Sequence, residues 1–139
     1  MSTQAAIGLG SKYEIDDPNN PGAWLKIAEI KDLTPPNEQA DVLDATNFDS
    51  PGSYKEFILG MTDPGDVTFT MNLVPGSASE IALLAAKLAR KAFHARITFP
   101  NAVVWTFDNL ITHYQPSVPV EGIMTCTVTA KVTGSVVHQ

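Results

Sequence analysis

Strict alternation of apolar and polar residues is the feature that most constrains how this chain can fold. The clearest run is 66–73, where the apolar residues are Val67, Phe69, Met71 and Leu73. The residues between them are Asp66, Thr68, Thr70 and Asn72. A period of two places the two sets on opposite faces of a β-strand, with one face on a core and the other in water. The run therefore predicts an antiparallel strand.

Similar alternation returns later in the chain and predicts further strands. The ranges are 93–99, 103–112 and 124–133, of which the last is rich in threonine. Strands with a less regular pattern are expected at 11–15, 24–33 and 38–46. Turn signals lie between the runs, at Pro35–Pro36, Asp63–Gly65 and Pro100–Asn101.

One α-helix is expected, over about 78–90. Ser77 and Glu80 have the spacing of a capping box, in which both side chains accept hydrogen bonds from backbone N–H groups. A single apolar stripe at helical spacing follows, formed by Ile81, Leu84, Ala85 and Leu88. We expect this stripe to pack on one face of the sheet. Arg90 and Lys91 fall at the carboxyl end, where the helix dipole favours cations.

Together these elements predict a mainly β fold, a sandwich or open barrel of about seven or eight strands with one flanking helix. A length of 139 residues suits one domain, which we expect to span 1–139. No apolar run approaches the roughly 18 residues that cross a bilayer, and the first residues lack the pattern of a secretion signal. We therefore expect a soluble protein without a membrane partner, made in the cytosol.

The charge of the chain argues against tight nucleic-acid binding. Its formal net charge is −6, and its nine Lys and Arg residues are scattered, with only Arg90 and Lys91 adjacent. Proteins that grip nucleic acid cluster basic side chains, which displace counterions from phosphates. Passage of nucleic acid without binding is compatible with this composition.

Signals for catalysis, for a metal or for a cofactor are missing from the sequence. Cys126 is the only cysteine, which excludes an intrachain disulfide and a multi-thiolate zinc site. The histidines His94, His113 and His138 are far apart in the chain, and no nucleophile motif accompanies them. Asp63–Asp66 could hold calcium, but turn chemistry and a solvated acidic face explain these residues better. We expect neither an enzyme nor a cofactor.

Residues 47–62 follow neither the strand nor the helix period, so we expect a long irregular loop there. Loops of this length are uncommon in a small domain and usually have a function. Six large apolar side chains lie in it, Phe48, Tyr54, Phe57, Ile58, Leu59 and Met61. Two interpretations remain open: the loop folds back over the core, or it docks on another subunit as an assembly loop.

Several segments are informative through their order and spacing. They are Ile30–Pro35, the loop after it, Gly65–Gly76 running into a helix, Ile97–Phe107 and the threonine-rich final strand. In this order they resemble the tail tube proteins of long-tailed phages of the lambda type. The resemblance covers roughly residues 24–133, and its more specific parts are the strand–Pro-Gly–helix join and the Phe-Pro-Asn turn.

The resemblance implies a β-sandwich-like fold and a structural role in a virion tail. Subunits of that family form hexameric rings whose sheets join around a channel, and the long loop reaches an adjacent subunit or ring. The implied partners are further copies of the chain, the tape measure protein, the tail initiator or baseplate, and the tail terminator. DNA passes without specific binding. Some relatives carry a C-terminal immunoglobulin-like domain, which we do not expect because this chain ends at Gln139.

A channel for DNA also suggests which residues line it. A wall that repels or ignores phosphate lets DNA slide, whereas a lining of Lys and Arg would hold it. We hypothesise that part of one polar face looks into an acidic lumen, with the candidates Asp41, Asp44, Asp66, Thr68, Thr70 and Asn72. The alternative places these residues on the outer surface.

Two further functions fit part of the sequence. A tube protein of a type VI secretion or contractile-tail system shares the expected architecture. A small ligand-binding β-sandwich would need a concave site with clustered aromatic side chains. Trp24 and Trp105, however, lie on expected strands and look like core residues.

Overall fold

The computed structural model describes residues 8–138, except residues 19 and 21. Within this part of the chain the backbone forms nine strands, one α-helix and one 3-10 turn. The strands are β1 (Lys12–Asp16), β2 (Trp24–Lys26), β3 (Ile30–Thr34), β4 (Gln39–Asp44), β5 (Phe57–Asp63), β6 (Asp66–Asn72), β7 (Phe93–Thr98), β8 (Val104–Ser117) and β9 (Thr125–His138). The helix α1 covers Ala78–Ala89, and the turn η1 covers Pro51–Ser53. The prediction of a mainly β fold with one helix is confirmed, with nine strands in place of seven or eight.

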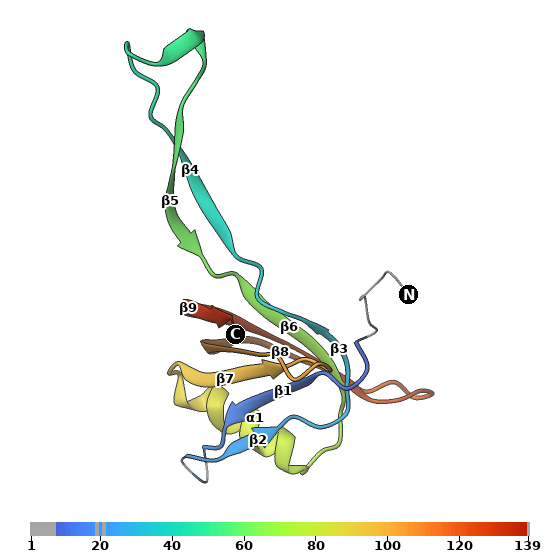
Figure 1. Ribbon diagram of the computed structural model, residues 1–139. Helices are drawn as coiled ribbons and strands as arrows, with labels where there is room; N and C mark the ends of the chain where they lie inside the picture. Colours follow the sequence, from blue (N-terminus) through green and yellow to red (C-terminus); the bar gives the residue numbers. More distant parts are fainter. Residues whose placement is uncertain (1–7, 19, 21, 139) are drawn as a thin grey trace, which may run out of the picture.

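Seven strands form one antiparallel sheet in the order β2-β1-β7-β8-β9-β6-β3, and β4 and β5 form a separate ribbon (Figure 1). The longest strands are β8 and β9, with 14 residues each. Both extend beyond the ranges expected from the sequence: β8 continues past Pro116, which lies opposite Cys126, and β9 continues to His138, which lies opposite Trp105. A proline next to a strand end removes only a terminal hydrogen bond of the ladder.

A very short link between the two edge strands forces the sheet to curve. β2 and β3 lie at opposite edges, yet only residues 27–29 separate them along the chain. The N–H of Ile27 donates to the carbonyl of Tyr13 at 3.0 Å, and the carbonyl of Glu29 accepts from the N–H of Asn72 at 3.0 Å. β2 and β3 do not pair, so the barrel stays open. The prediction of one strand over 24–33 is wrong, because Glu29 has a φ of 59° and turns the chain.

The hydrophobic core lies inside this curved sheet. On β6 the residues Val67, Phe69 and Met71 are buried and their neighbours are not, as the alternation predicts. β9 contributes every second residue from Cys126 to Val132. Other members of the cluster are Tyr13, Ile15, Ile27, Leu73, Ala82, Leu83, Ala95, Ile97 and Phe107. Each large side chain buried here contributes about 1.5–3 kcal/mol before entropy is counted.

Helix α1 begins and ends where local chemistry predicts. Ser77 Oγ accepts a hydrogen bond from the N–H of Glu80 at 3.3 Å, and Glu80 Oε1 accepts one from the N–H of Gly76 at 3.0 Å. The first bond satisfies a donor that the first turn leaves free, and the second ties the residue before the N-cap to the helix. The helix ends at Ala89, because Arg90 adopts the left-handed conformation with a φ of 52°. No α-helix in the described residues has the length and hydropathy to cross a membrane.

The face that α1 presents to the sheet differs from the expected one. Its buried residues are Ser79, Ala82, Leu83 and Ala86. The predicted stripe points away from the core, with Ile81 50% exposed and Leu88 78% exposed, so that prediction is wrong. Ser79 fixes the rotation of the helix, because its Oγ accepts a hydrogen bond from the N–H of Ala28 at 2.9 Å. The two buried alanines then allow a close approach to the sheet.

The ribbon of β4 and β5 leaves the sheet as a long projection (Figure 1). We call residues 38–63 the arm and the rest of the described chain the body. The arm continues the β3–β6 pair, but Pro35 and Pro36 interrupt one strand and Pro64 interrupts the other. Proline has no N–H for a ladder bond, so regular pairing stops where the arm leaves the body.

The loop expected over 47–62 is therefore irregular only in part. Residues 57–63 form β5, which pairs with β4, and η1 lies near the tip. The expectation missed β5 because Phe57, Ile58 and Leu59 are consecutive apolar residues without alternation. The interpretation in which this segment folds back over the core is wrong, since its apolar side chains are exposed.

Candidate assembly surface

The two strands of the arm pair in a register that leaves apolar side chains on both faces of the ribbon. Val42 lies opposite Leu59, and at the next position of the ladder Leu43 lies opposite Ile58. Adjacent positions on a strand point to opposite sides, so one apolar pair lies on each face. All four side chains are at least half exposed.

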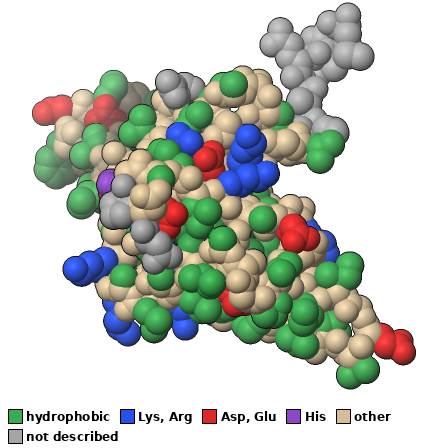
Figure 2. All heavy atoms as spheres, turned by 90° about the horizontal axis from the view of Figure 1, so that it is seen from below, with side chains coloured by type: hydrophobic (Ala, Val, Ile, Leu, Met, Phe, Trp, Pro, Cys, Tyr) green, Lys and Arg blue, Asp and Glu red, His purple; other side chains and the backbone are tan. Residues whose placement is uncertain are grey.

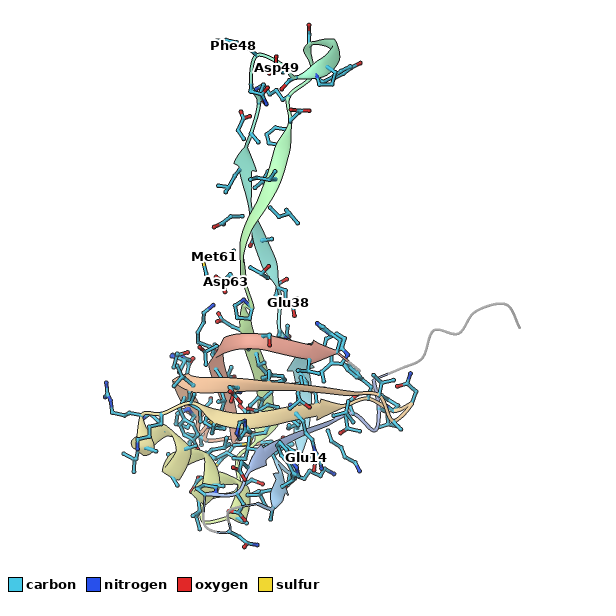
Figure 3. All side chains as sticks on the ribbon, turned by 60° about the vertical axis from the view of Figure 1, so that its left-hand side comes forward. Glu14, Glu38, Phe48, Asp49, Met61 and Asp63 are labelled. Carbon is cyan, nitrogen blue, oxygen red and sulfur yellow. The ribbon has the colours of Figure 1, made fainter. Side chains whose placement is uncertain are left out.

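Further apolar side chains extend this surface along the arm. Phe57 and Met61 are 57% and 87% exposed, and Tyr54 is 78% exposed. Phe48 lies at the far end of the arm and Met61 closer to the body (Figure 3). All six residues expected to form an assembly loop thus lie on the arm. Large exposed apolar patches on soluble proteins mark interaction sites, so another molecule is expected to cover the arm.

Val42 and Leu43 are not among the residues expected from the sequence, although they belong to the same surface. The sequence nevertheless contains a pattern that could have identified them, two or more apolar residues in succession. Consecutive apolar residues in a strand are typical of strands that are covered on both faces. The runs at 42–43 and 57–59 both show it.

Hydrogen bonds within the tip hold the arm in a defined shape. The N–H of Glu56 donates to Thr46 Oγ1 at 2.9 Å, and Ser50 Oγ donates to Glu56 Oε2 at 2.8 Å. Asp44 Oδ1 accepts from the N–H of Thr46 at 2.9 Å. Hydrogen bonds from the hydroxyl and the N–H of Thr46 lower the pKa of Asp44. The apolar side chains are therefore presented on an ordered scaffold.

Two side-chain contacts connect the base of the arm to β9, an ion pair at Lys131 and a hydrogen bond at His138. Lys131 Nζ lies 2.6 Å from Asp63 Oδ1 and 3.7 Å from Asp66 Oδ1. The hydrogen bond between Lys131 and Asp63 lowers the pKa of Asp63 and raises the pKa of Lys131. At the other end of the arm's backbone, next to β4, Glu38 Oε1 lies 2.9 Å from Nε2 of His138 on β9. Figure 3 shows Glu38 and Asp63 where the arm meets the body. Such exposed pairs contribute little stability individually, but here they restrain both strands.

Close backbone packing at the same place leaves no room for a side chain. A Cβ atom on Gly65 would lie 2.1 Å from the carbonyl oxygen of Asn37. Gly65 also has a φ of 80°, which favours glycine. Gly65 therefore helps to set the direction in which the arm leaves the body.

Most of the net charge of the chain lies on the arm. Residues 38–63 hold six of the fifteen Asp and Glu residues and one of the nine Lys and Arg residues. The arm thus carries −5 of the formal net charge of −6, and all other residues together carry −1. The surface that needs a partner is both apolar and acidic.

The six lumen candidates fall into two separate groups. The first group lies on the outer face of β6 and comprises Asp66, Thr68, Thr70 and Asn72. Their cross-strand neighbours on β9 are Lys131, Thr129, Thr127 and Thr125. The second group, Asp41 and Asp44, lies on β4 in the arm. The structure therefore does not bring all six residues onto one face.

The described residues show no cluster suited to metal binding. No three His, Cys, Asp or Glu side chains gather there in a way that could hold a metal ion. His94 pairs with Asp108 on the outer face of the sheet. Cys126 lies in the core, where burial raises the pKa of its thiol. An open depression lies beside Leu33, Phe99 and Trp105.

The tryptophans lie on strands, as expected, but neither belongs to the buried core. Trp24 is 38% exposed, and the guanidinium of Arg96 lies 4.5 Å from the centre of its ring. Trp105 is half-buried and packs edge-on against Phe99 at a ring distance of 4.9 Å. The expectation that Trp24 and Trp105 are core residues is therefore wrong.

Comparisons with known proteins agree with this structure. The model of the family described as lambda phage tail tube protein matches residues 8–138. No curated protein matches the sequence. A chain from the tail of an empty GTA particle, solved with C6 symmetry, has a TM-score of 0.81 at 14% identity and covers 97% of this chain and 99% of its own. At this identity the likeness shows the fold.

Two other solved structures extend the comparison. A chain of the SPP1 tail tube has a TM-score of 0.67 at 15% identity over 94% of this chain and 77% of its own. A chain from the sheath/tube terminator of PVC, an extracellular contractile injection system, has a TM-score of 0.73 at 12% identity over 100% and 99%. The same fold thus occurs in a phage tail tube and in a contractile injection system.

The family match, the fold and the projecting arm define a structural protein of phage-like tails. The match covers nearly the whole described chain, and it favours a tail protein over a ligand-binding sandwich. The chain belongs to the lambda phage tail tube protein family. It is a tail tube protein and part of the virion tail, which confirms the predicted structural role and the predicted localisation in the tail.

Proposed function

We propose that this chain assembles into hexameric rings that stack into a tube, through which DNA passes during ejection. The arm carries this proposal, because its apolar side chains lie outside the core and on both faces of the ribbon. The C6 symmetry of the GTA tail, which contains a chain of the same fold, supports the six-fold arrangement.

Copies of the chain can cover the arm through a repeated contact. Burial of each large apolar side chain contributes about 1.5–3 kcal/mol before entropic costs. A contact between two different surfaces of identical subunits closes into a ring or continues as a filament. The outer edges of β2 and β3 offer a second surface, since unpaired strand edges tend to find partners.

The proposed lumen surface is the outer face of β6 with its neighbours on β9. Threonine hydroxyls dominate this face, and Thr70 Oγ1 lies 3.4 Å from Thr127 Oγ1. Asp66 and Lys131 are the charged residues in this register, and they lie close to each other. Such a surface lacks the clustered cations that hold phosphates by counterion release. Asp41 and Asp44 would add negative charge wherever the arm lies in the tube.

A structural role in the tube requires no catalytic step, so we infer that the protein is not an enzyme. Its partners would be further copies of itself along the tube, the tape measure protein within it, and initiator and terminator proteins at its ends. DNA would pass without specific binding.

Tube formation by the purified protein tests this proposal. We expect hollow tubes or six-fold rings in negative-stain micrographs as the protein concentration rises. Substituting Ile58→Ser and Leu59→Ser together, one on each face of the arm, is expected to leave a folded monomer that forms no tubes. Circular dichroism checks the fold of the variant.

A matched control removes an exposed apolar side chain from the body. Val120 is fully exposed in the connection between β8 and β9, so Val120→Ser lowers apolar surface without touching the arm. It is expected to form tubes. Wild-type protein that stays monomeric at every concentration, or arm variants that assemble as readily as wild type, would contradict the proposal.

A further inference from the structure

Helix α1 carries a second apolar stripe that the body leaves uncovered. We call Ile81, Leu84, Ala85 and Leu88 the outer stripe. Ile81 is 50% exposed and Leu88 is 78% exposed, while the other two residues are partly buried. The side of the helix that packs on the sheet is different and contains Ala82, Leu83 and Ala86.

A helix that is apolar on both sides is unusual at a protein surface. Surface helices have one apolar stripe and a polar opposite face, and helices that are apolar all round are buried. The outer stripe of α1 thus has the composition of a covered face. Its partner must come from outside the body, because the core already occupies the opposite side.

Basic side chains follow the outer stripe at the carboxyl end of the helix. Lys87, Arg90 and Lys91 are all exposed and lie within five positions of each other. They are three of the nine Lys and Arg residues of the chain. An apolar stripe with cations at one end complements a ligand that is apolar and acidic. The arm, with a net charge of −5, has both properties.

The arm and α1 also lie at opposite ends of the protein. The arm leaves the body at one end, and α1 lies towards the other (Figures 1 and 3). Seen from the end away from the arm, hydrophobic side chains lie exposed, with Lys and Arg side chains among them (Figure 2). A projection at one end and its receptor at the other produce a head-to-tail contact, which can repeat without limit along a filament.

The lengths of the two surfaces match. The six residues of β4 extend by about 3.3 Å each, so the paired part of the arm is about 20 Å long. The twelve residues of α1 rise by about 1.5 Å each and span about 18 Å. One face of the ribbon can therefore contact the outer stripe over the whole helix.

We propose that the outer stripe of α1 is the receptor for the arm of another copy of this chain, the copy that precedes it along the tube. This inference rests on the proposed function and names the two surfaces that meet. One apolar face of the arm covers Ile81 and Leu88, and its carboxylates approach Lys87, Arg90 and Lys91. The other face of the arm remains for a second neighbour.

Cross-linking between copies tests the contact directly. The single native cysteine, Cys126, is buried, so introduced cysteines give little background. One preparation carries Leu88→Cys on α1 and the other carries Ile58→Cys or Leu59→Cys, one residue from each face of the arm. The two preparations are mixed, assembled into tubes and treated with a short bis-maleimide cross-linker. A covalent dimer is expected for at least one of the two arm positions.

Val120→Cys in place of Leu88→Cys is the matched control, since Val120 is exposed but lies far along the chain from α1. Tubes in which the arm cross-links to Val120 and not to Leu88 would overturn the inference and leave the proposed function intact. Absence of tubes from wild-type protein would instead contradict the proposed function.

A charge exchange provides a second, independent measurement. Lys87→Glu with Lys91→Glu is expected to raise the protein concentration needed for tubes about tenfold at low salt. Asp41 and Asp44 lie on opposite faces of the arm, so Asp41→Lys and Asp44→Lys are added to that variant separately, and at least one of them is expected to restore most of the loss. A loss that the arm substitutions do not reverse would overturn the pairing of these two surfaces.

Discussion

Asn109 Nδ2 donates a 2.7 Å hydrogen bond to the hydroxyl oxygen of Tyr13, and both side chains are buried in the core. The bond connects β8 to β1 across the intervening strand β7. Burial raises the pKa of Tyr13, so the hydroxyl stays neutral. A polar pair of this kind favours one arrangement of the strands, because any shift would leave both groups unpaired in an apolar surrounding.

Tyr13→Phe is expected to lower the free energy of unfolding by about 1–3 kcal/mol, since the buried amide of Asn109 loses its acceptor. Urea unfolding of the monomer, followed by circular dichroism, measures this change. The double variant with Asn109→Leu is expected to cost less than the sum of the single variants. Costs that add to within about 0.5 kcal/mol would show that the two side chains are not coupled.

The orientation of α1 predicts opposite results for two leucines of the same helix. Leu83 is fully buried and Leu88 is 78% exposed. Leu83→Ala is expected to destabilise the monomer by about 2–5 kcal/mol. Leu88→Ala is expected to change its stability by less than about 0.5 kcal/mol. Equal losses in urea unfolding would mean that the helix is rotated from the position described.

The base of the arm predicts a strong effect at one glycine. Gly65→Ala combines a φ of 80° with a Cβ atom 2.1 Å from the carbonyl oxygen of Asn37. Gly134 has a φ of 78°, and a Cβ atom there would meet nothing within 4 Å beyond its chain neighbours, so Gly134→Ala measures the backbone strain alone. Gly65→Ala is expected to be the more destabilising of the two in thermal unfolding and to reduce tube formation. Similar melting temperatures for both variants would argue against close packing at Asn37.

The ion pair between Asp63 and Lys131 predicts a dependence on pH. The folded-state pKa of Asp63 is lowered from 3.8, so the pair favours the folded state above pH 3.8 and this contribution is lost as the pH falls below that value. The pKa of Lys131 is raised from 10.5, so its contribution is present below pH 10.5 and is lost as the pH rises beyond it. Lys131→Gln is expected to return the pKa of the Asp63 carboxyl towards 3.8 in an NMR titration. Lys87→Gln, which alters a lysine on α1, is the control and is expected to leave that pKa in place.

The proposed lumen face predicts a gain of DNA binding after a single substitution. Thr70→Lys would place a cation in each subunit on the threonine-rich surface, and counterion release would then favour DNA. Tubes of this variant are expected to retain DNA at low salt and release it as salt rises, whereas tubes of the uncharged control Thr70→Gln are not. Retention is measured by co-sedimentation of short duplexes with tubes. Equal behaviour of the two variants would place this face away from the channel.

Local patterns were sufficient for the elements whose chemistry is local. The alternation in 66–73 predicted β6 and its buried face, because a strand with one face on a core needs only a period of two. Ser77 and Glu80 predicted the start of α1, since capping involves residues a few positions apart. Six of the exposed apolar side chains of the arm were also identifiable from the composition of residues 47–62, whereas Val42 and Leu43 were missed.

Long-range contacts were needed for everything that depends on residues far apart in the chain. The rotation of α1 rests on a hydrogen bond between Ser79 and Ala28, and the helix carries two apolar stripes, so periodicity alone could select the wrong one. The pairing of β4 with β5 was hidden because both faces of the arm are apolar, which removes the alternation that marks a strand. The sequence also could not show that Asp41 and Asp44 lie apart from the polar face of β6, because only the fold places the arm outside the sheet. The order of residues was thus enough to predict the family, the core strands and the limits of the helix, whereas packing between distant segments selected which apolar surfaces face the core and which remain for other copies of the chain.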